Sequence, residues 1–493
     1  MDIKKKGNME QIKKEDLGIN VKKEDDFSEW YTQIIQKGDL ADYSLVSGCI
    51  IFKPTAYALW ENIKNSCDER FKKIGIKNVY FPLLIPESLL KKESTHLKGF
   101  SPEVAWVTEA GNTKLSERLA IRPTSETIMY NSYSKWIRSW KDLPLRYNQW
   151  NNVVRWEFNN PVPFLRTREF LWNEGHTVFA TKTEAEAEGK EIMGIYDDVL
   201  RNYLALPSLI GKKSTGETFA GAEYTLSCEH YLPNGKAIQG PDFHHDGQIF
   251  AKAYDIKFLN KEGKEEYAYQ NTFAISTRNL GIMLAMHSDN RGVVIPPKLA
   301  PNKVVVIPIL FDDSKQKVLK KAREIYSKIE KFSPIIDDRE DYSAGWKYNE
   351  WELKGIPIRL EIGPKDIEID QVILVRRDTL EKKKIKIKDI SKEIEIMLED
   401  IQKNLYKKAE KLLKGNIEEA SNFNEVKKAL ENKKLVYIPW CEEEKCAKGI
   451  KEKIEGVKPL NSPLNQKENE ISGKKCALCG KPAKKRFYFG KSY

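Results

Sequence analysis

Long apolar runs are absent from the sequence. Its 493 residues contain no stretch of about 18 consecutive apolar side chains, the length that a helix needs to cross a bilayer, so we expect no membrane span. Residues 1–25 mix Lys with Asp and Glu, and they have neither an aromatic residue nor the apolar core of a secretory signal. We therefore expect a flexible extension at 1–25 in a chain that stays in the cytoplasm.

Cysteine is also scarce, with seven in the whole chain. A large chain with few cysteines and no secretory signal indicates a reducing compartment, where thiols or a metal are expected rather than disulfides. Four of the seven form two close pairs, Cys441-x4-Cys446 and Cys476-x2-Cys479. Two such pairs of thiolates are the ligand set of a tetrahedral site filled by protein, so we predict structural Zn²⁺ there.

Charge is nearly balanced. The chain has 83 basic and 72 acidic residues, a formal net charge of +11. This small positive excess is compatible with a polyanionic partner but does not require one. The length predicts about three domains, and a hydrophobic content of 40% is sufficient for sizeable cores.

Apolar periodicity predicts the main elements. Long helices are expected after Pro54, where a strand and a second helix follow, and from Ser391 to Leu413. A proline-rich segment at 293–303 marks a domain boundary. Beyond it we expect a small α/β domain, with strands at 304–311, 357–362 and 371–377 and a helix at 314–332.

Residues 147–176 are the most informative stretch of the chain. The run 152–158 predicts a strand with Arg155 and Glu157 on one face, and a turn with two prolines then returns the chain through a second arginine-bearing segment. Arginines placed in this way can clamp a phosphate-bearing ligand bidentately. A solvated surface hairpin is the simpler explanation, and composition alone favours it.

Two more polar groups lie beside apolar runs. An apolar strand ends at Pro123, and the loop after it presents Thr124, Ser125 and Glu126. A buried carboxylate at a strand end needs a cationic partner, such as a ligand's ammonium. The alternative is that Thr124 or Ser125 caps the helix that follows, and one loop can serve both purposes.

A strand and a histidine pair follow downstream. Trp172, Glu174 and His176 alternate, which places them on one face of a strand. The run HHD at 244–246 lacks the spacing of a helical zinc pair, so we expect no metal there.

Several strings occur in one order: RPTSE at 122–126, RWE at 155–157, FLRTREFLW at 164–172, FAGAEYT at 219–225, AIQG at 237–240, HHDGQ at 244–248, STR at 276–278 and WELKGIP at 351–357. Together they resemble the prolyl-tRNA synthetases, class II aminoacyl-tRNA synthetases, in their archaeal/eukaryotic form. The resemblance covers nearly the whole chain after about residue 26. It implies an α/β multidomain fold, with an antiparallel-sheet class II catalytic domain, an α/β anticodon-binding domain and a C-terminal α/β zinc-binding domain. After the extension at 1–25, the expected boundaries are 26–300, 301–405 and 406–493.

The resemblance also implies an activity and partners. L-Proline would be activated by ATP with Mg²⁺ to prolyl-adenylate and then transferred to tRNA(Pro). The helix, strand and proline at 54–86 resemble the motif that builds a homodimer. The terminal Tyr493 would fold back towards the active site.

The family's residue roles transfer to matching positions of this chain. Catalysis is expected of Arg155 and Arg278. Proline binding is expected of Thr124, Glu126, Arg155, Trp172, Glu174, His176, Phe219, His244 and Ser276. ATP binding is expected of Arg155, Glu157, Arg166, Thr167, Gln239, Thr277 and Arg278. Anticodon recognition is expected of Glu352, Arg359 and Lys365, a carboxylate and two cations suited to guanine.

The chain departs from the family pattern at five positions. Asp242 and Phe243 replace the usual Thr-Ser, Asp246 replaces Leu, Phe273 replaces Trp, and Ala274 replaces Gly. The departures at Asp242, Phe243 and Phe273 leave open an alternative, a catalytically silent paralogue that binds RNA or regulates. A threonyl- or seryl-type ligase is a second alternative, which the aromatic pocket residues and the absence of a zinc ligand set in the catalytic region disfavour.

Overall fold

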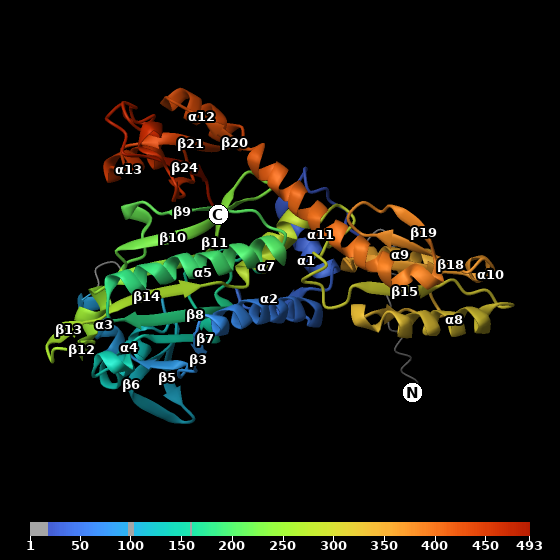
Figure 1. The fold of residues 1–493 in the computed structure, drawn as a ribbon, viewed down its shortest axis with the longest axis horizontal. Coiled ribbons are helices and arrows are strands. Elements are labelled where there is room, and N and C mark those ends of the chain that lie inside the picture. The colour runs from blue at the N-terminus through green and yellow to red at the C-terminus, as the bar shows by residue number, and fades with distance from the viewer. Residues whose placement is uncertain (1–17, 97–102, 158–159) are drawn as a thin grey trace, which may run out of the picture. The chain divides into compact units, whose positions relative to one another are not determined.

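The computed structural model describes residues 18–96, 103–157 and 160–493 (Figure 1). They form two compact units, one made of residues 18–42, Phe52–Ala56 and His287–Ile401, the other of Tyr43–Ile51, Tyr57–Met286 and Gln402–Tyr493. Most of the expected extension, residues 1–17, lies outside the described residues. Within the described ranges, no helix is long and apolar enough to span a membrane.

The first unit is built on a sheet in the order β16-β15-β17-β18-β19. Its parallel core pairs β15 with β16 and β17, whereas β18 and β19 add antiparallel edges. The sheet and its helices confirm the expected α/β domain. Their bounds are β15 Val304–Pro308, α8 Lys315–Lys328, β16 Ile335–Ile336, α9 Ala344–Lys354, β17 Ile358–Ile362, α10 Pro364–Glu368, β18 Gln371–Arg376 and β19 Lys382–Lys386.

Helix α1 (Phe27–Lys37) belongs to this first unit, although we had placed it in the catalytic domain. Asp26 caps its N-terminus, and the indole of Trp30 donates to the carbonyl of Asp289 at 3.2 Å. Within the expected extension, Lys23 Nζ donates to the carbonyl of Ser288 at 2.9 Å. Residues 18–25 therefore contact the unit, and the domain boundary at residue 26 stays a prediction.

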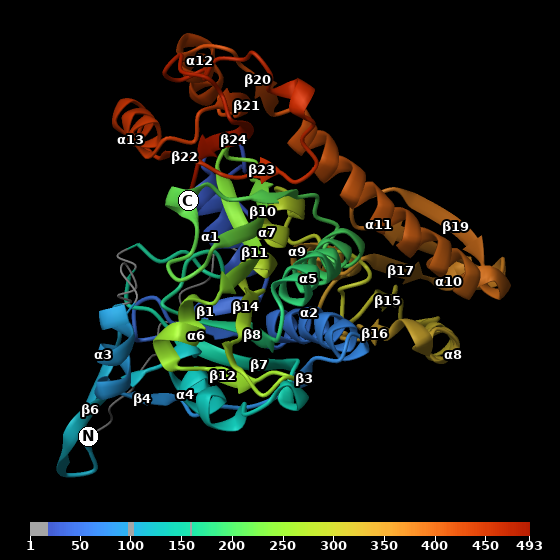
Figure 2. The same cartoon turned by 60° about the vertical axis from the view of Figure 1, so that its left-hand side comes forward.

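The second unit is built on an eight-stranded sheet among the described residues, in the order β23-β9-β10-β11-β14-β8-β7-β3. Its neighbours from β23 to β7 are antiparallel, as expected for the catalytic domain, and only β3 joins in parallel. Figures 1 and 2 show β10, β11, β14, β8 and β7 in this order. The bounds are β3 Lys77–Asn78, β7 Leu145–Val154, β8 Glu169–Phe179, β9 Leu209–Lys212, β10 Tyr224–Tyr231, β11 Ala237–Gly247, β14 Tyr269–Ala274 and β23 Ser462–Pro463.

The two faces of this sheet have different neighbours. Helix α5 (Lys182–Asn202) packs on one face, where a side chain at Gly189 would strike the ring of Phe243. Helices α4 (Glu126–Trp136) and α6 (Ile249–Tyr254) share an apolar core with β8 through Val178. A smaller sheet of β4 (Leu84–Pro86), β5 (Trp106–Ala110) and β6 (Thr113–Ile121) precedes α4. The layers leave the polar residues of one sheet face between α4 and the strand ends.

The helices expected near Pro54 and Ser391 are confirmed as α2 (Pro54–Lys73) and α11 (Ile390–Lys414), and α3 (Glu87–His96) follows Pro86 as predicted. The single strand expected after α2 is instead two short strands, β3 and β4. The strand predicted at 152–158 was placed too late, because β7 runs from Leu145 and ends at Val154.

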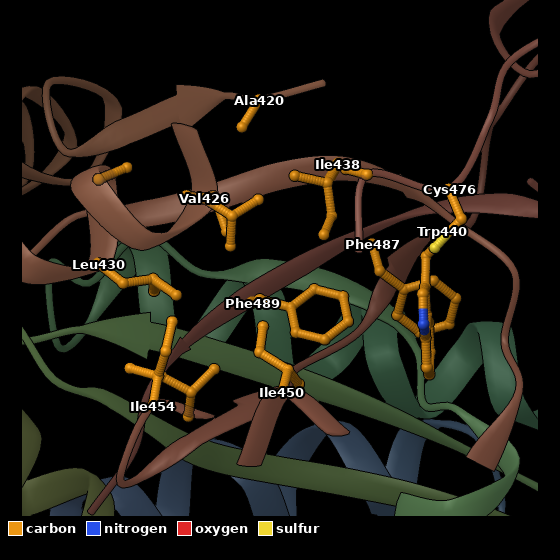
Figure 3. Close-up of a cluster of buried hydrophobic side chains, with 14 of the residues drawn as sticks. Ala420, Val426, Leu430, Ile438, Trp440, Ile450, Ile454, Cys476, Phe487 and Phe489 are labelled. Carbon is orange, nitrogen blue, oxygen red and sulfur yellow. The ribbon is translucent and has the colours of Figure 1, made fainter. Parts of the chain in front are cut away.

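The C-terminal residues form a separate core within the second unit. Strands β20 (Ile417–Glu419), β21 (Leu435–Trp440), β22 (Val457–Pro459) and β24 (Lys485–Lys491) make one sheet, and α12 (Phe423–Glu431) and α13 (Glu444–Lys453) accompany it. Figure 3 shows Trp440 beside Phe487 and Phe489, whose rings meet its indole edge-on at 4.8 and 5.1 Å. Cys476 lies at the edge of this core, so the predicted metal ligands are attached to a packed domain.

Candidate active site

The second unit contains a cavity of about 240 Å³ on the α4 side of its large sheet. It brings together residues that are up to 120 positions apart in the sequence, from the α4 loop, β8, β10 and β11. Nine of the residues expected to bind proline or ATP line it: Thr124, Glu126, Arg155, Trp172, Glu174, His176, Phe219, Gln239 and His244.

Strand β8 supplies one wall of the cavity. Trp172, Glu174 and His176 alternate on it and all line the cavity, so their predicted common face is confirmed. Glu174 is 2% exposed and accepts hydrogen bonds from Asn151 Nδ2 at 2.7 Å and from Ser125 Oγ at 2.8 Å. Burial alone would raise the pKa of Glu174, but these bonds and the nearby His176 lower it overall. Glu174 thus remains an anion at the wall.

The loop before α4 supplies a second carboxylate. Thr124 Oγ1 donates to Glu126, which is 4% exposed at the start of the helix. The alternative that Ser125 caps α4 with its side chain is wrong. Its hydroxyl and backbone N–H both donate to Glu174 at 2.8 Å. The loop therefore serves the cavity rather than the helix end.

Arg155 and Arg278 meet at a smaller hollow that Arg155 shares with the main cavity. Ser276 and Thr167 line the same hollow. Arg155 follows the end of β7, and its Nε donates to the carbonyl of Pro123 at 2.9 Å. Arg278 Nε donates to the carbonyl of Leu165 at 3.1 Å. These backbone bonds hold two guanidinium groups at one place, which suits an anionic ligand.

Phe219 and His244 form the aromatic wall. Their rings stack with centroids 4.7 Å apart, and His244 Nδ1 lies 2.8 Å from the hydroxyl of Thr225. Burial lowers the pKa of His244 from its ordinary value, which favours a neutral ring. This wall is apolar with one polar contact, as expected for a small-molecule site.

Three expected ATP contacts lie outside the two hollows. Glu157 and Arg166 are exposed. Thr277 is buried at 1% exposure, and its backbone N–H donates to the carbonyl of Leu171 at 2.9 Å. Their roles stay predictions.

Sequence reasoning missed Lys213 and Glu217, which also line the cavity. Lys213 is 5% exposed, and its Nζ donates to Glu229 at 2.8 Å. Glu217 pairs with Lys451 of α13 at 2.8 Å. The signal for Lys213 was its position in the lysine-bearing turn before the FAGAEYT string, but only the folded sheet places it at the cavity.

The departures from the family pattern fall on different faces. Asp242 lines the cavity, where it accepts a hydrogen bond from Gln239 Nε2 at 2.7 Å. The rings of Phe243 and Phe273 point the other way. A side chain at Gly175 would lie 2.1 Å from the Phe273 ring, and Phe273 packs on Phe71 of α2 with centroids 5.5 Å apart. Both phenylalanines are therefore core residues on the α5 side, and neither argues against catalysis.

The four C-terminal cysteines come together as predicted. The sulfur atoms of Cys441, Cys446, Cys476 and Cys479 all lie within 4.8 Å of one another. Two pairs are 3.6 and 3.8 Å apart, close to the roughly 3.8 Å between sulfurs of a tetrahedral site with Zn–S bonds of about 2.3 Å. The donor set and spacing fit a metal ion.

The predicted anticodon residues share one area of the first unit. Arg359 Nη1 donates to Glu352 at 2.7 Å, and its Nε donates to Glu361 at 2.9 Å. Arg359 is only 6% exposed, whereas Lys365 is exposed. Arg359 therefore already has anionic partners within the protein.

Comparisons with known proteins match this architecture. A model of the class II core domain of tRNA synthetases (G, H, P, S and T) matches residues 106–287, an anticodon-binding domain model matches 303–396, and a prolyl-tRNA synthetase C-terminal model matches 423–493. A proline–tRNA ligase of Alkaliphilus oremlandii is 48% identical over 470 residues, which cover 95% of this chain and 96% of that protein. The chain belongs to the prolyl-tRNA synthetase family.

Two further relatives agree. The cytoplasmic proline–tRNA ligase of Arabidopsis thaliana is 45% identical over 98% of this chain and 92% of its own. A crystal structure of prolyl-tRNA synthetase from Cryptosporidium parvum, complexed with halofuginone and AMPPNP, has a TM-score of 0.93 at 42% identity and covers 97% of this chain and 100% of its own. The expected fold class is thereby confirmed, and the silent-paralogue alternative is not favoured.

Proposed function

We propose that this chain activates L-proline with ATP to prolyl-adenylate and transfers the prolyl group to tRNA(Pro). The observation that carries the proposal is the convergence of Arg155 and Arg278 beside a cavity that holds Glu126 and Glu174. A zwitterionic amino acid and a nucleoside triphosphate need this combination of charges. The family relationship and the full-length similarity to proline–tRNA ligases support it.

The chemistry follows from these charges. An oxygen of the proline carboxylate attacks the α-phosphorus of ATP, and pyrophosphate leaves. No protein nucleophile is needed, so the side chains act by orientation and charge stabilisation. Arg155 bridges the carboxylate and the α-phosphate, and Arg278 holds the phosphate chain. Mg²⁺ bound with ATP would neutralise part of the phosphate charge.

The proline ring and amine are held by the remaining walls. Phe219 and Trp172 offer apolar contact to the ring, and Glu126 faces the secondary ammonium. Glu174 is occupied by hydrogen bonds from Asn151 and Ser125, so it orders the loop and adds negative potential. A pocket of about 240 Å³ suits proline with part of its adenylate.

The second cofactor and the compartment are also proposals. We infer that Cys441, Cys446, Cys476 and Cys479 hold one structural Zn²⁺, because four protein thiolates leave no open position. The reducing compartment that such thiols require supports a cytoplasmic location. Glu352, Arg359 and Lys365 are proposed to read the anticodon of tRNA(Pro).

A homodimer is supported by the exposed surface of the second unit. Large apolar side chains are exposed there between residues 43 and 84, near the segment that resembles the dimer motif. They are Tyr43, Leu45, Val46, Ile51, Tyr57, Tyr80, Leu83 and Leu84. Sedimentation equilibrium of the purified chain would report its mass; a monomer at micromolar concentration would contradict this assignment.

The test of function is ATP–pyrophosphate exchange with each of the twenty amino acids. Proline should support exchange far better than the others. Arg155→Ala should lower the rate by about 100-fold or more, because a charged contact to the reacting centre is lost. Arg168→Ala is the matched control, since Arg168 donates to the carbonyl of Ser47 and does not line the cavity. Exchange that is independent of Arg155 would contradict the proposed site.

A further inference from the structure

Asp246 is a carboxyl group enclosed within the protein. It lies at a bulge of β11, between His245, which pairs with Asn271 of β14, and Gly247, which pairs with Gln270. Its side chain is 0% exposed. Among the described residues, neither of its carboxyl oxygens has a hydrogen-bond partner. An isolated ionised carboxylate in such a place is very costly, so a group there tends to keep its proton.

The charge that acts on Asp246 has the same sign. It is the carboxylate of Glu126, at the start of α4. Burial first, and Glu126 second, raise the pKa of Asp246 well above its usual range. Glu126 itself accepts a hydrogen bond from the Thr124 hydroxyl, which favours its ionised form. Of the two carboxyl groups, Asp246 is therefore the one that holds the proton.

The other titratable groups around this part of the sheet are already engaged. On β8, Glu174 accepts bonds from Ser125 and Asn151, and His176 bonds the hydroxyl of Tyr130. On β11, His244 bonds Thr225. His245 faces Asn271 on the α5 side. Before β10, Glu223 pairs with Lys182 at 2.8 Å. No printed contact among the described residues brings a cation to Asp246.

We propose that Asp246 is protonated in the free protein and releases its proton to solvent when a cationic amine occupies the cavity beside Glu126. The O–H bond of the carboxyl group breaks, the proton passes to water or buffer, and the ammonium charge offsets the new carboxylate. This inference rests on the proposed function, in which the amine is that of proline. Asp246 acts as a positioning residue, because it strengthens the negative potential at Glu126 only when the ligand is present.

Proton release makes ligand affinity depend on pH. While Asp246 is neutral in the free protein and ionised in the complex, the proline dissociation constant should fall by up to about tenfold for each unit rise in pH. A chain without a titratable group at this position should lose that dependence. Asp246→Asn keeps the shape of the side chain, and Asp246→Leu places there the residue that is usual in the family.

The experiment is calorimetric titration of the holoprotein with proline, without ATP, at pH 7 in two buffers of different ionisation enthalpy. The difference between the two heats gives the number of protons released. The expected number for the wild type is about one more than for Asp246→Asn, with Asp246→Leu matching the Asn variant. Contributions from His176 and His244 are common to all three proteins and cancel.

Three results would overturn the inference. One is wild-type binding with equal heats in both buffers, and another is an Asn variant that releases as many protons as the wild type; in either case the proposed function would stand. A protein that gives no heat with proline and no proline-dependent exchange would remove both the inference and the proposed function. Thermal unfolding of each variant, compared with the wild type, shows that a lost signal is not lost folding.

Discussion

Asp242 introduces a charge into the cavity at the residue scale. Its carboxylate accepts a hydrogen bond from Gln239, which is expected to contact ATP, and lies 3.5 Å from His244 Nε2. The usual residue, Thr, has no charge. A carboxylate near a triphosphate repels it unless Mg²⁺ lies between them. Asp242 therefore couples the nucleotide site to the metal that accompanies ATP.

We expect the apparent ATP affinity in pyrophosphate exchange to depend steeply on Mg²⁺ concentration. Asp242→Thr should flatten that dependence without loss of proline activation, because the repulsion disappears. Asp242→Asn is the control that removes the charge and retains the shape. A wild type whose ATP affinity changes little across a Mg²⁺ titration would show that Asp242 has no such role.

At the element scale, β10 carries a histidine whose protonation opposes folding. His230 is 0% exposed, and its Nδ1 donates to the carbonyl of Pro207 at 3.0 Å. Its Nε2 lies against Gly240 of β11, where a side chain would approach to 2.7 Å. Burial lowers the pKa of His230 from 6.5 to about 4. Protonation therefore favours the unfolded chain, in which the ring is solvated.

The free energy of unfolding should accordingly fall in mild acid. The contribution of neutral His230 is fully present above about pH 6.5 and is lost as the pH falls towards about 4, by up to about 3 kcal/mol over that window. His230→Gln should show a shallower loss between pH 7.5 and pH 5 in urea unfolding. Equal slopes for the two proteins would assign the acid sensitivity to other groups.

The sheet and helices of the first unit determine how anticodon recognition can be probed. Removing Arg359 would leave Glu352 and Glu361 without their buried cation and would destabilise the domain, so a lost activity would be ambiguous. Lys365 is exposed and carries the same predicted role without that burden.

Lys365→Ala should lower charging of tRNA(Pro) by about tenfold, the order expected for one lost charged contact to a base. Pyrophosphate exchange should be unchanged, because the reaction with ATP does not involve the anticodon. Lys384→Ala, an exposed lysine on β19, is the control. An equal fall in exchange and charging would show that Lys365 supports the fold and does not read RNA.

At the scale of the whole molecule, the C-terminal domain is tied to the catalytic sheet. β23 pairs with β9, and Asn461 Nδ2 donates to the carbonyls of Leu209 and Ser227 at 2.8 and 3.1 Å. Tyr493 ends the chain with its backbone N–H on the carbonyl of Ala237, two residues from Gln239. A metal that orders the C-terminal domain therefore also steadies one edge of the catalytic unit.

Metal analysis of the purified chain should find about one Zn²⁺ per chain, and Cys446→Ser should lose it. Hydrogen exchange should then rise in α13, which carries Cys446 in its first turn. Cys49→Ser is the control, because Cys49 lies outside the cluster. A metal-free wild type with four reactive thiols at these positions would contradict the zinc assignment.

Local patterns in the sequence determined much of this protein. Alternation placed Trp172, Glu174 and His176 on one face because a strand has a period of two, whatever it packs against. Helical periodicity located α2 and α11, and paired cysteines identified the metal site, because each property lies within a short span. The family strings named the remaining site residues that line the cavity.

The tertiary structure alone decided which partner each side chain met. Ser125 could have capped α4, but β8 brings Glu174 within hydrogen-bond distance of it. Asp246 and Phe243 lie three residues apart on one strand, yet one is influenced by Glu126 and the other packs against α5. Strand register and the helices packed on each face set these environments, and both depend on contacts between residues distant in the sequence.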